Sequence, residues 1–321
     1  MIDVVGIGSA LVDLTIRVDD ETLERLGLKK ATMRLVDADR SRSILEALAG
    51  CPMEKTPGGS AANTAAGVAT LGGSAVFMGK VGGDEFGDFY RDESERMGIA
   101  MRLARHRAMT GHAITLITPD SERTFATHLG AAVHFASDDV IEDEIRAARA
   151  LHVEGYMLEG SMKEATLHAM EIARGGGVKV SIDLADSSLV GRNLDEFKSI
   201  ARDYAGILYA NEDEAAAFTG ERGEKALGVM ASMCEIAVVK LGERGSLIRK
   251  GTEVHRVEPY RVAVVNTNGA GDMYAAGMLY GLSRGLSLDK AGRIASYAAS
   301  RVVSQVGARL SSRPDLGQIG I

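Results

Sequence analysis

The chain has 321 residues, of which 45% are hydrophobic and 25% charged, as in globular rather than disordered proteins. Its net charge of −7 argues against a nucleic-acid or anionic-membrane surface. No apolar run reaches the roughly 18 residues that a membrane span needs, and no secretory signal precedes the first strand-like run. Two cysteines, Cys51 and Cys234, do not make a disulfide framework, so we expect a cytoplasmic protein.

The N-terminal half predicts one buried strand and a separate small sheet. Residues 4–8 form an apolar run typical of a buried strand, and Leu11 stands where a dinucleotide-binding loop needs its third glycine. Four short segments of mixed polarity are typical of half-exposed strands: 14–18, 32–36, 112–118 and 124–128. Because they lie in two separated parts of the sequence, at about 13–36 and 110–130, we expect a lid inserted into a single domain spanning residues 1–321.

A pair of glycines precedes a helix of small residues at 60–71, after an amphipathic helix at 37–49. Gly58 and Gly59 come directly before Ser60, a residue type that caps helices, and Asn63 lies one turn later. A closely packed buried helix explains the alanines as well as a ligand site does. It does not explain a polar residue on so apolar a helix, so we predict a binding site at this helix start.

From residue 138 onward the pattern predicts an α/β fold with a doubly wound, mainly parallel sheet. Predicted helices at 138–148, 161–174, 195–203, 211–219 and 223–233 alternate with predicted strands at 150–154, 178–183, 206–209 and 236–240. Ligands bind beyond the carboxyl ends of parallel strands, so polar residues there are site candidates. They occur at four strand ends: Asp183, residues 211–214, residues 240–245 and the turn 266–272.

The turn at 266–272 is the most informative stretch of the chain. Gly269 and Gly271 flank Ala270 and let the backbone point successive N–H groups at one anion, while the following helix adds its positive dipole end. A carboxylate there repels an anion unless it accepts a proton. A helix cap explains Asp272 alone but not the two glycines before it. We predict that Asp272 is the base of a phosphoryl transfer and that the Gly-Ala-Gly backbone is its anion site.

Two of the strand-end clusters are open to two interpretations. Asn211 and Glu214 share one face at a helix start, from which they could hold a magnesium ion through its water shell. Favourable acids at a helix N-terminus explain them equally well. Lys240, Gly242 and Gly245 would bring charge and backbone close to a nucleotide, although a hairpin turn by itself explains these residues better.

The segments 58–63 and 79–87 and the late turn 269–272 resemble, in order and spacing, the ribokinase-like (PfkB) family of sugar and nucleoside kinases. The resemblance covers almost the whole chain. It implies a doubly wound α/β fold with a small β-sheet lid, and transfer of the γ-phosphate of ATP to a hydroxymethyl group with Mg²⁺. It also implies roles for individual residues: Asp272 as base; Gly269, Ala270 and Gly271, next to Asn268, as anion hole; Asp13, Gly58, Gly59, Ser60 and Asn63 at the substrate; Arg123 on the lid near the phosphates; Asn211 and Glu214 at the magnesium; and Gly242 and Gly245, beside Lys240, at ATP.

Within the family, the chain is most similar to adenosine kinases. The expected reaction is phosphorylation of the 5′-hydroxyl of a ribonucleoside, adenosine to AMP first, with a free sugar such as ribose or fructose as the alternative and a non-catalytic sensor as a rival. Ser9 stands where adenosine kinases commonly carry Asn, which loosens the substrate assignment. Asn266 stands where the family usually has Asp, so we expect weak binding of a monovalent cation. The expected partners are the small-molecule substrate and ATP, without nucleic acid or membrane, in a monomer or a homodimer formed through the lids.

Overall fold

The computed structural model describes residues 1–120 and 122–321 and contains a nine-stranded and a five-stranded sheet. The strands are β1 (Ile2–Ile7), β2 (Leu11–Arg17), β3 (Met33–Leu35), β4 (Met53–Pro57), β5 (Ala75–Gly82), β6 (Ile99–His106), β7 (Gly111–Ile117), β8 (Arg123–His128), β9 (Ala148–Glu154), β10 (Lys179–Asp183), β11 (Ala205–Asn211), β12 (Ile236–Lys240), β13 (Ser246–Lys250) and β14 (Glu253–Val257). The helices are α1 (Asp20–Arg25), α2 (Ala38–Ala47), α3 (Ser60–Thr70), α4 (Glu85–Arg96), α5 (Glu142–Arg146), α6 (Lys163–Gly175), α7 (Ser187–Arg192), α8 (Leu194–Tyr204), α9 (Glu212–Thr219), α10 (Gly223–Met230), α11 (Ala270–Ser283) and α12 (Leu288–Val303). In the part of the chain described, no helix is long and apolar enough to cross a membrane.

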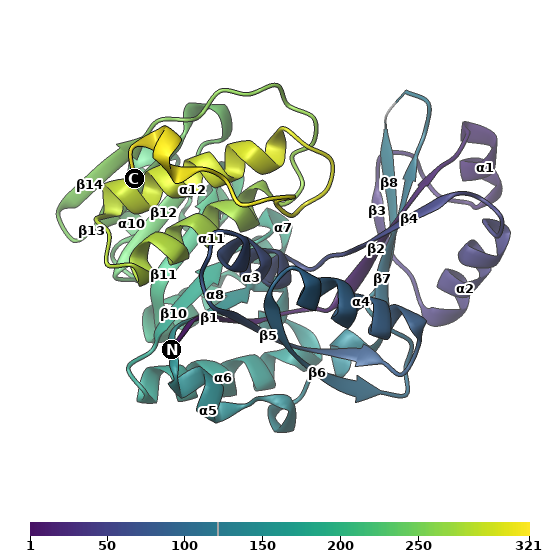
Figure 1. Cartoon of the computed structure of the whole chain (residues 1–321), viewed down its shortest axis with the longest axis horizontal. Helices are drawn as coiled ribbons and strands as arrows, with labels where there is room; N and C mark the ends of the chain where they lie inside the picture. Colours follow the sequence, from purple (N-terminus) through teal and green to yellow (C-terminus); the bar gives the residue numbers. More distant parts are fainter. Residues whose placement is uncertain (121) are drawn as a thin grey trace.

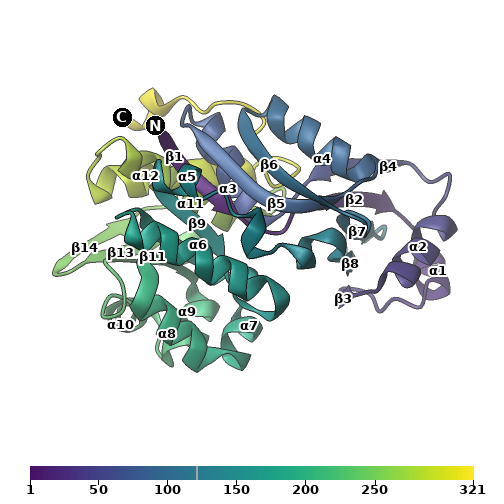
Figure 2. The ribbon, with the colours of Figure 1, turned by 90° about the horizontal axis from the view of Figure 1, so that it is seen from below.

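The large sheet has the strand order β14-β13-β12-β11-β10-β9-β1-β5-β6 and is parallel except for β13 and β14. Both of its faces are covered, which is why the central strands β1, β5 and β9 are mostly buried. Val5 and Ile7 of β1 join one core with residues of α6 and α8, whereas Val4 joins a second core with residues of α3 and α11. Helices α3, α11 and α12 lie together in Figure 1, and α5 and α6 come to the front in Figure 2. The predicted α/β, doubly wound sheet is confirmed.

The small sheet projects from the large one (Figure 1) and has the order β3-β8-β7-β2-β4. Four of its strands coincide with the predicted half-exposed segments, and β4 is an addition that the sequence pattern did not predict. On β2, Val12, Leu14 and Ile16 are buried in one core with Ile44 of α2. Asp13 points to the opposite face, since side chains alternate along a strand. The sheet therefore turns one apolar face to its own helices and one polar residue toward α3.

Two predicted elements differ from the structure. The predicted helix at 138–148 is shorter, because residues 140 and 141 are extended and α5 begins only at Glu142. Three consecutive acids, Glu142, Asp143 and Glu144, occupy the first turn of α5, where the helix dipole favours negative charge. Strand β9 then begins at Ala148, two residues earlier than predicted.

The polar ends of neighbouring parallel strands meet at one edge of the large sheet, as predicted. Glu154 at the end of β9 pairs in register with Asp183 of β10. Asn211 at the end of β11 pairs in register with Lys240 of β12. The first turn of α3 contacts this edge, since Ala61 N donates to Glu154. The first turn of α11 lies beside it, since Ser60 donates to Asp272. This edge holds the candidate site.

Candidate active site

Asp272 lies in the first turn of α11 and is held by two side chains of α3. Its Oδ1 accepts a hydrogen bond from Ser60 Oγ at 2.7 Å, and its Oδ2 accepts one from Asn63 Nδ2 at 2.9 Å. Burial raises the pKa of Asp272, while these two hydrogen bonds act in the opposite direction. The contacts join residues 209 to 212 positions apart in the sequence and fix a carboxylate at a helix N-terminus.

The turn before α11 exposes backbone donors next to this carboxylate. Gly269 is the N-cap and has φ of +76°, and a Cβ there would collide with the carbonyl oxygen of Ala308, so only glycine fits. The first N–H groups of an α-helix have no partner within the helix. Ala270 N donates to Thr267 O at 3.3 Å, which leaves the N–H groups of Gly271 and Asp272 directed out of the helix end. This is the geometry of an anion site.

Asn268 and Arg123 both donate to the side chain of Asn266. The backbone N–H of Asn268 donates to Asn266 Oδ1 at 2.9 Å, so it is already occupied. Arg123, at the start of β8, donates from Nη1 to the same oxygen at 2.9 Å. The small sheet is thus hydrogen-bonded to the turn that precedes α11, and the predicted role of Arg123 near the phosphates stays a prediction.

The glycine pair before α3 is required by close packing against the small sheet. Gly59 has φ of +90°, and a Cβ there would collide with Ser9 O. A Cβ on Gly58 would lie 2.5 Å from Asp13 Oδ2. The prediction that Ser60 caps the helix is wrong: Gly59 is the N-cap without a side-chain bond, and the Ser60 hydroxyl donates to Asp272 instead.

Asp13 reaches from β2 toward the start of α3. Burial raises its pKa to about 6, the Arg309 guanidinium lowers it, and the Asp272 carboxylate raises it. Asp13 and Asp272 therefore lie within electrostatic range of each other. The predicted substrate residues Asp13, Gly58, Gly59, Ser60 and Asn63 are brought together around this space.

Glu154 belongs to the same space and was not predicted. The buried carboxylate accepts from the N–H of Ala61 at 2.8 Å and from that of Ser9 at 3.4 Å. Its pKa is raised to about 7, mainly by burial and also by Asp272, against the lowering effect of the N–H donors. The available signal was its position: a glutamate closing an apolar strand is unusual unless it faces a site.

Lys240 places a buried positive charge under the anion site. Its Nζ lies 2.6 Å from Asp183 Oδ2, and a Cβ on Gly271 would lie 3.1 Å from that Nζ. Asp183, Glu214 and Asp272 all raise the pKa of Lys240, against the effect of burial. The Lys240 ammonium thus remains charged among the carboxylates of β10, α9 and α11.

Asn211 and Glu214 bind each other at the start of α9. Asn211 N donates to Glu214 Oε2 at 2.7 Å and Asn211 Nδ2 to Glu214 Oε1 at 2.6 Å, while Asn211 Oδ1 accepts from the N–H of Glu214 at 2.8 Å. Among the described residues, no group of three His, Cys, Asp or Glu side chains could hold a metal ion. The pair forms a reciprocal cap of α9, as the alternative interpretation expected, and its role at a water-bound magnesium ion stays a prediction.

The glycines after β12 form the predicted hairpin turn into antiparallel β13. Gly245 has φ of +80°, and a Cβ there would collide with Val257 O, so its glycine is required by packing. Gly242 has φ of +60° with open space around it. The predicted ATP role of both glycines stays a prediction.

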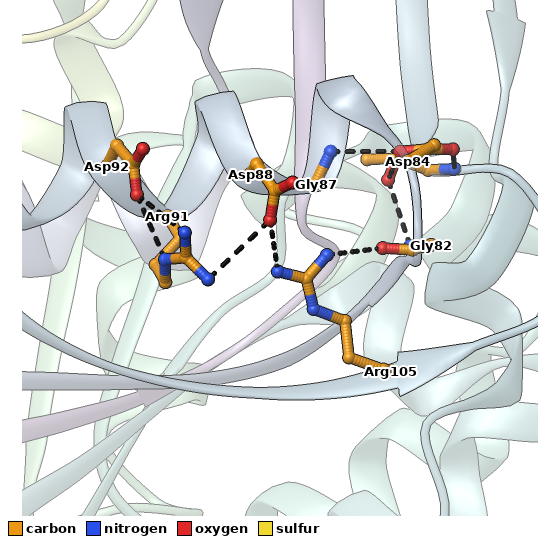
Figure 3. Close-up of polar contacts among 8 residues, drawn as sticks. Gly82, Asp84, Gly87, Asp88, Arg91, Asp92 and Arg105 are labelled. Carbon is orange, nitrogen blue, oxygen red and sulfur yellow. Dashed lines mark hydrogen bonds and ion pairs between the residues drawn. The ribbon is translucent and has the colours of Figure 1, made fainter.

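The segment 79–87 holds the small sheet in place. Asp84 caps α4 by accepting from Gly87 N at 2.9 Å, and its second oxygen accepts from Thr110 N at 2.7 Å. Arg105 donates to Gly82 O at 2.7 Å and pairs with Asp88 at 2.6 Å (Figure 3). These contacts tie β5, α4 and the approach to β7 together, so this part of the motif is structural.

The chain matches a known family over most of its length. The profile of the pfkB family carbohydrate kinases matches residues 30–315. The chain is 32% identical over 274 residues to the 5-dehydro-2-deoxygluconokinase of Listeria monocytogenes serotype 4b, with 79% of this chain and 84% of that protein covered.

Solved structures give the same result. A probable sugar kinase from Rhizobium etli superposes with a TM-score of 0.90 at 35% identity, covering 99% of this chain and 98% of that one. The adenosine kinase of Sinorhizobium meliloti superposes with a TM-score of 0.87 at 35% identity, covering 97% of both chains. The expected family is confirmed, and with it a phosphotransferase that acts on an alcohol group. The chain belongs to the pfkB family of carbohydrate kinases.

Proposed function

We propose that the chain phosphorylates a hydroxyl group of a small sugar or sugar acid, of the class to which 5-dehydro-2-deoxygluconate belongs, with magnesium ATP. The observation that carries this proposal is the carboxylate of Asp272, held by Ser60 and Asn63 beside the free N–H groups of α11. A hydroxyl that attacks a phosphoryl group must lose its proton while negative charge spreads over the transferring oxygens. A raised pKa suits Asp272 to accept that proton.

Each charge that develops in this reaction has a counterpart in the site. The N–H groups of Gly271 and Asp272 would donate to the transferring oxygens, and the Lys240 ammonium beneath Gly271 adds a fixed positive charge. Asn211 and Glu214 would hold the magnesium ion through water, where the ion neutralises phosphate charge. Asp13 would accept hydrogen bonds from substrate hydroxyls and orient the attacking one.

Polar side chains beside the start of α3 favour a hydroxyl-rich substrate. Ser9, Asp13 and Glu154 lie there: Glu154 accepts from the N–H of Ala61, a Cβ on Gly58 would meet Asp13, and the Ser9 hydroxyl donates to the sulfur of Met157 at 3.7 Å. Hydroxyl groups pair with such donors and acceptors, whereas a purine ring needs an apolar slot. The curated relative that acts on a sugar acid supports the same class.

A nucleoside such as adenosine is the second candidate, and one feature of the small sheet favours it. Leu35 lies in the same cross-strand row as Asp13, by way of Thr127 on β8 and Ala113 on β7, so both side chains share one face of the small sheet. Leu35 and Met33, two residues before it, are each 60% exposed and would offer an apolar wall to a base. The Sinorhizobium meliloti adenosine kinase at 35% identity supports this candidate.

A coupled ADP-release assay with magnesium ATP decides between the two. The substrates are 5-dehydro-2-deoxygluconate, ribose, fructose and adenosine, each with and without potassium. The proposal expects the highest kcat/KM for a sugar or sugar acid. Turnover confined to adenosine would replace it with the second candidate. Absence of turnover with every substrate, together with tight binding of one of them by calorimetry, would indicate a sensor and reject both.

A further inference from the structure

The C-terminal segment 307–310 passes directly beneath the candidate site. Gly307 O accepts from Asn266 Nδ2 at 3.4 Å, and Ala308 O packs against the position where Gly269 would carry a Cβ. The next residue, Arg309, turns inward and is only 9% exposed. A charged side chain is thus inserted from the tail into the floor of the site.

The Arg309 guanidinium donates hydrogen bonds to three neutral acceptors. Nε donates to Asn63 Oδ1 at 2.9 Å, Nη1 to Ser94 Oγ at 3.2 Å, and Nη2 to Gly58 O at 3.4 Å. Among the described residues, no carboxylate lies within ion-pair distance of it. A buried guanidinium without a direct counter-ion is costly, and an apolar side chain would fill the space more cheaply.

The bond from Arg309 supports the same orientation of the Asn63 amide that the Asp272 carboxylate requires. An amide has a donor end and an acceptor end of nearly equal size, so its orientation is set by its neighbours. A guanidinium only donates, so it requires the oxygen of Asn63 on its own side. The NH₂ group of Asn63 is then directed at Asp272 Oδ2, 2.9 Å away. The reversed amide would put its oxygen against the carboxylate.

We infer that Arg309 is a positioning residue for the base: through Asn63 it keeps a hydrogen-bond donor on Asp272 and holds that carboxylate in its reactive orientation. This inference rests on the proposed role of Asp272 in phosphoryl transfer. The same guanidinium lowers the pKa of Asp13, so it also balances the second carboxylate of the site. Neither effect has a signal in the sequence, because Arg309 and Asn63 are 246 positions apart.

The test compares Arg309→Met and Arg309→Lys with Ser94→Ala, which removes another partner of the same guanidinium but leaves its bond to Asn63. With the substrate that the wild type phosphorylates best, Arg309→Met should lower kcat at least about tenfold, since a positioned base contributes far more than that. In the dependence of kcat on pH, the apparent pKa of the acid limb should rise by at least about half a unit, because Asp272 loses a hydrogen-bond donor. Arg309→Lys should recover part of kcat, and Ser94→Ala should lose stability without moving the limb.

Four further charged groups also influence Asp272: Asp13 on β2, Glu154 on β9, Asp183 on β10 and Lys240 on β12. They are unchanged in every variant. Arg309 also acts on Asp272 through its own charge, so Arg309→Gln, which removes the charge but can still donate to Asn63, separates that effect from the loss of the Asn63 contact. An unchanged acid limb in folded Arg309→Met would overturn the inference.

A second readout is independent of turnover and separates this inference from the proposed function. Carbon-13 NMR of the side-chain carboxyl groups, with Asp272→Asn to assign the resonance, gives the pKa of Asp272 directly. The inference expects a higher pKa in Arg309→Met than in the wild type, in Ser94→Ala and in Arg309→Gln. The same pKa in Arg309→Met and Arg309→Gln would refute it, whatever the substrate, because the lost charge alone would then explain the change. Absence of turnover in the wild type would count only against the proposed function.

Discussion

The Lys240 ammonium lies 2.6 Å from Asp183 under the turn that carries Asp272, and only 14% of the lysine side chain is exposed. Lysine and aspartate stand at the ends of two strands of the same sheet, separated by β11. A buried pair of this kind gains little by itself over apolar residues, but the loss of one partner leaves an unpaired charge. We relate the pair to the anion site because Lys240 lies directly below Gly271, and not because the pair stabilises the fold.

Replacing Lys240 by Met should destabilise the protein by about 3–5 kcal/mol, because Asp183 is left buried without its partner. Urea unfolding measures this loss, and the double variant Lys240→Met/Asp183→Asn should recover most of it. A loss below about 1 kcal/mol, the size of an exposed ion pair, would contradict the buried geometry. The double variant should still bind ATP more weakly than the wild type, since the positive charge under Gly271 is gone.

Glu214 should govern the requirement for magnesium. Glu214→Ala should raise the Mg²⁺ concentration for half-maximal turnover about tenfold, whereas the neighbouring Glu212→Ala, also in the first turn of α9, should not. Burial raises the pKa of Glu214 to about 7, so the wild-type requirement should rise as the pH falls through 7 and the carboxylate is protonated. Equal effects of both substitutions, or a requirement independent of pH, would count against a magnesium role.

Glu154 should make the fold less stable as the pH rises. Its folded-state pKa of about 7 lies above the ordinary value of 4.5, so its stabilising contribution is complete below pH 4.5 and is lost as the pH rises through 7. Between pH 5 and pH 8, the wild type should lose roughly 2–3 kcal/mol more than Glu154→Gln. Glu159→Gln is the control, because the Arg192 guanidinium holds the pKa of Glu159 near 2, outside this range. Parallel stability profiles for wild type and Glu154→Gln would disprove the assignment.

The two glycines of the hairpin turn should respond differently to alanine. Gly245→Ala forces a Cβ into Val257 O at a positive φ, so it should abolish stable folding or cost several kcal/mol. Gly242→Ala meets open space and should cost only about 1 kcal/mol of left-handed strain. If Gly242 lines the ATP site, its alanine variant should raise KM for ATP with kcat nearly unchanged. Similar unfolding free energies for the two variants would contradict the described turn.

The large sheet and the edge that holds the site were predictable, because both depend on local pattern. Apolar runs ending at Asp183, Asn211 and Lys240 place three polar residues at the same edge once the strands are parallel. The small strand β4 was not predictable, since its five residues include Glu54, Lys55 and a proline. A proline is tolerated there because β4 is an edge strand that pairs only with β2.

The individual side-chain contacts of the site could not be predicted from the sequence. Ser60 has the residue type of a cap, yet its hydroxyl goes to a carboxylate 212 positions away, and no local rule distinguishes the two partners. Arg309 follows the last long helix in an irregular segment without periodicity. Its burial depends on the path of the tail beneath Gly269, a property of the tertiary structure alone.

The central claim is that Asp272 is the base of phosphoryl transfer, and Asp272→Asn tests it most directly. Asparagine keeps the shape of the side chain and can still accept from Ser60, but its NH₂ group then faces the NH₂ group of Asn63. The free energy of unfolding should therefore fall by about 1–3 kcal/mol, and the variant should remain folded. Turnover of the best substrate should fall at least about a hundredfold, because the hydroxyl proton has no acceptor. A folded Asp272→Asn protein with turnover near that of the wild type would contradict the account.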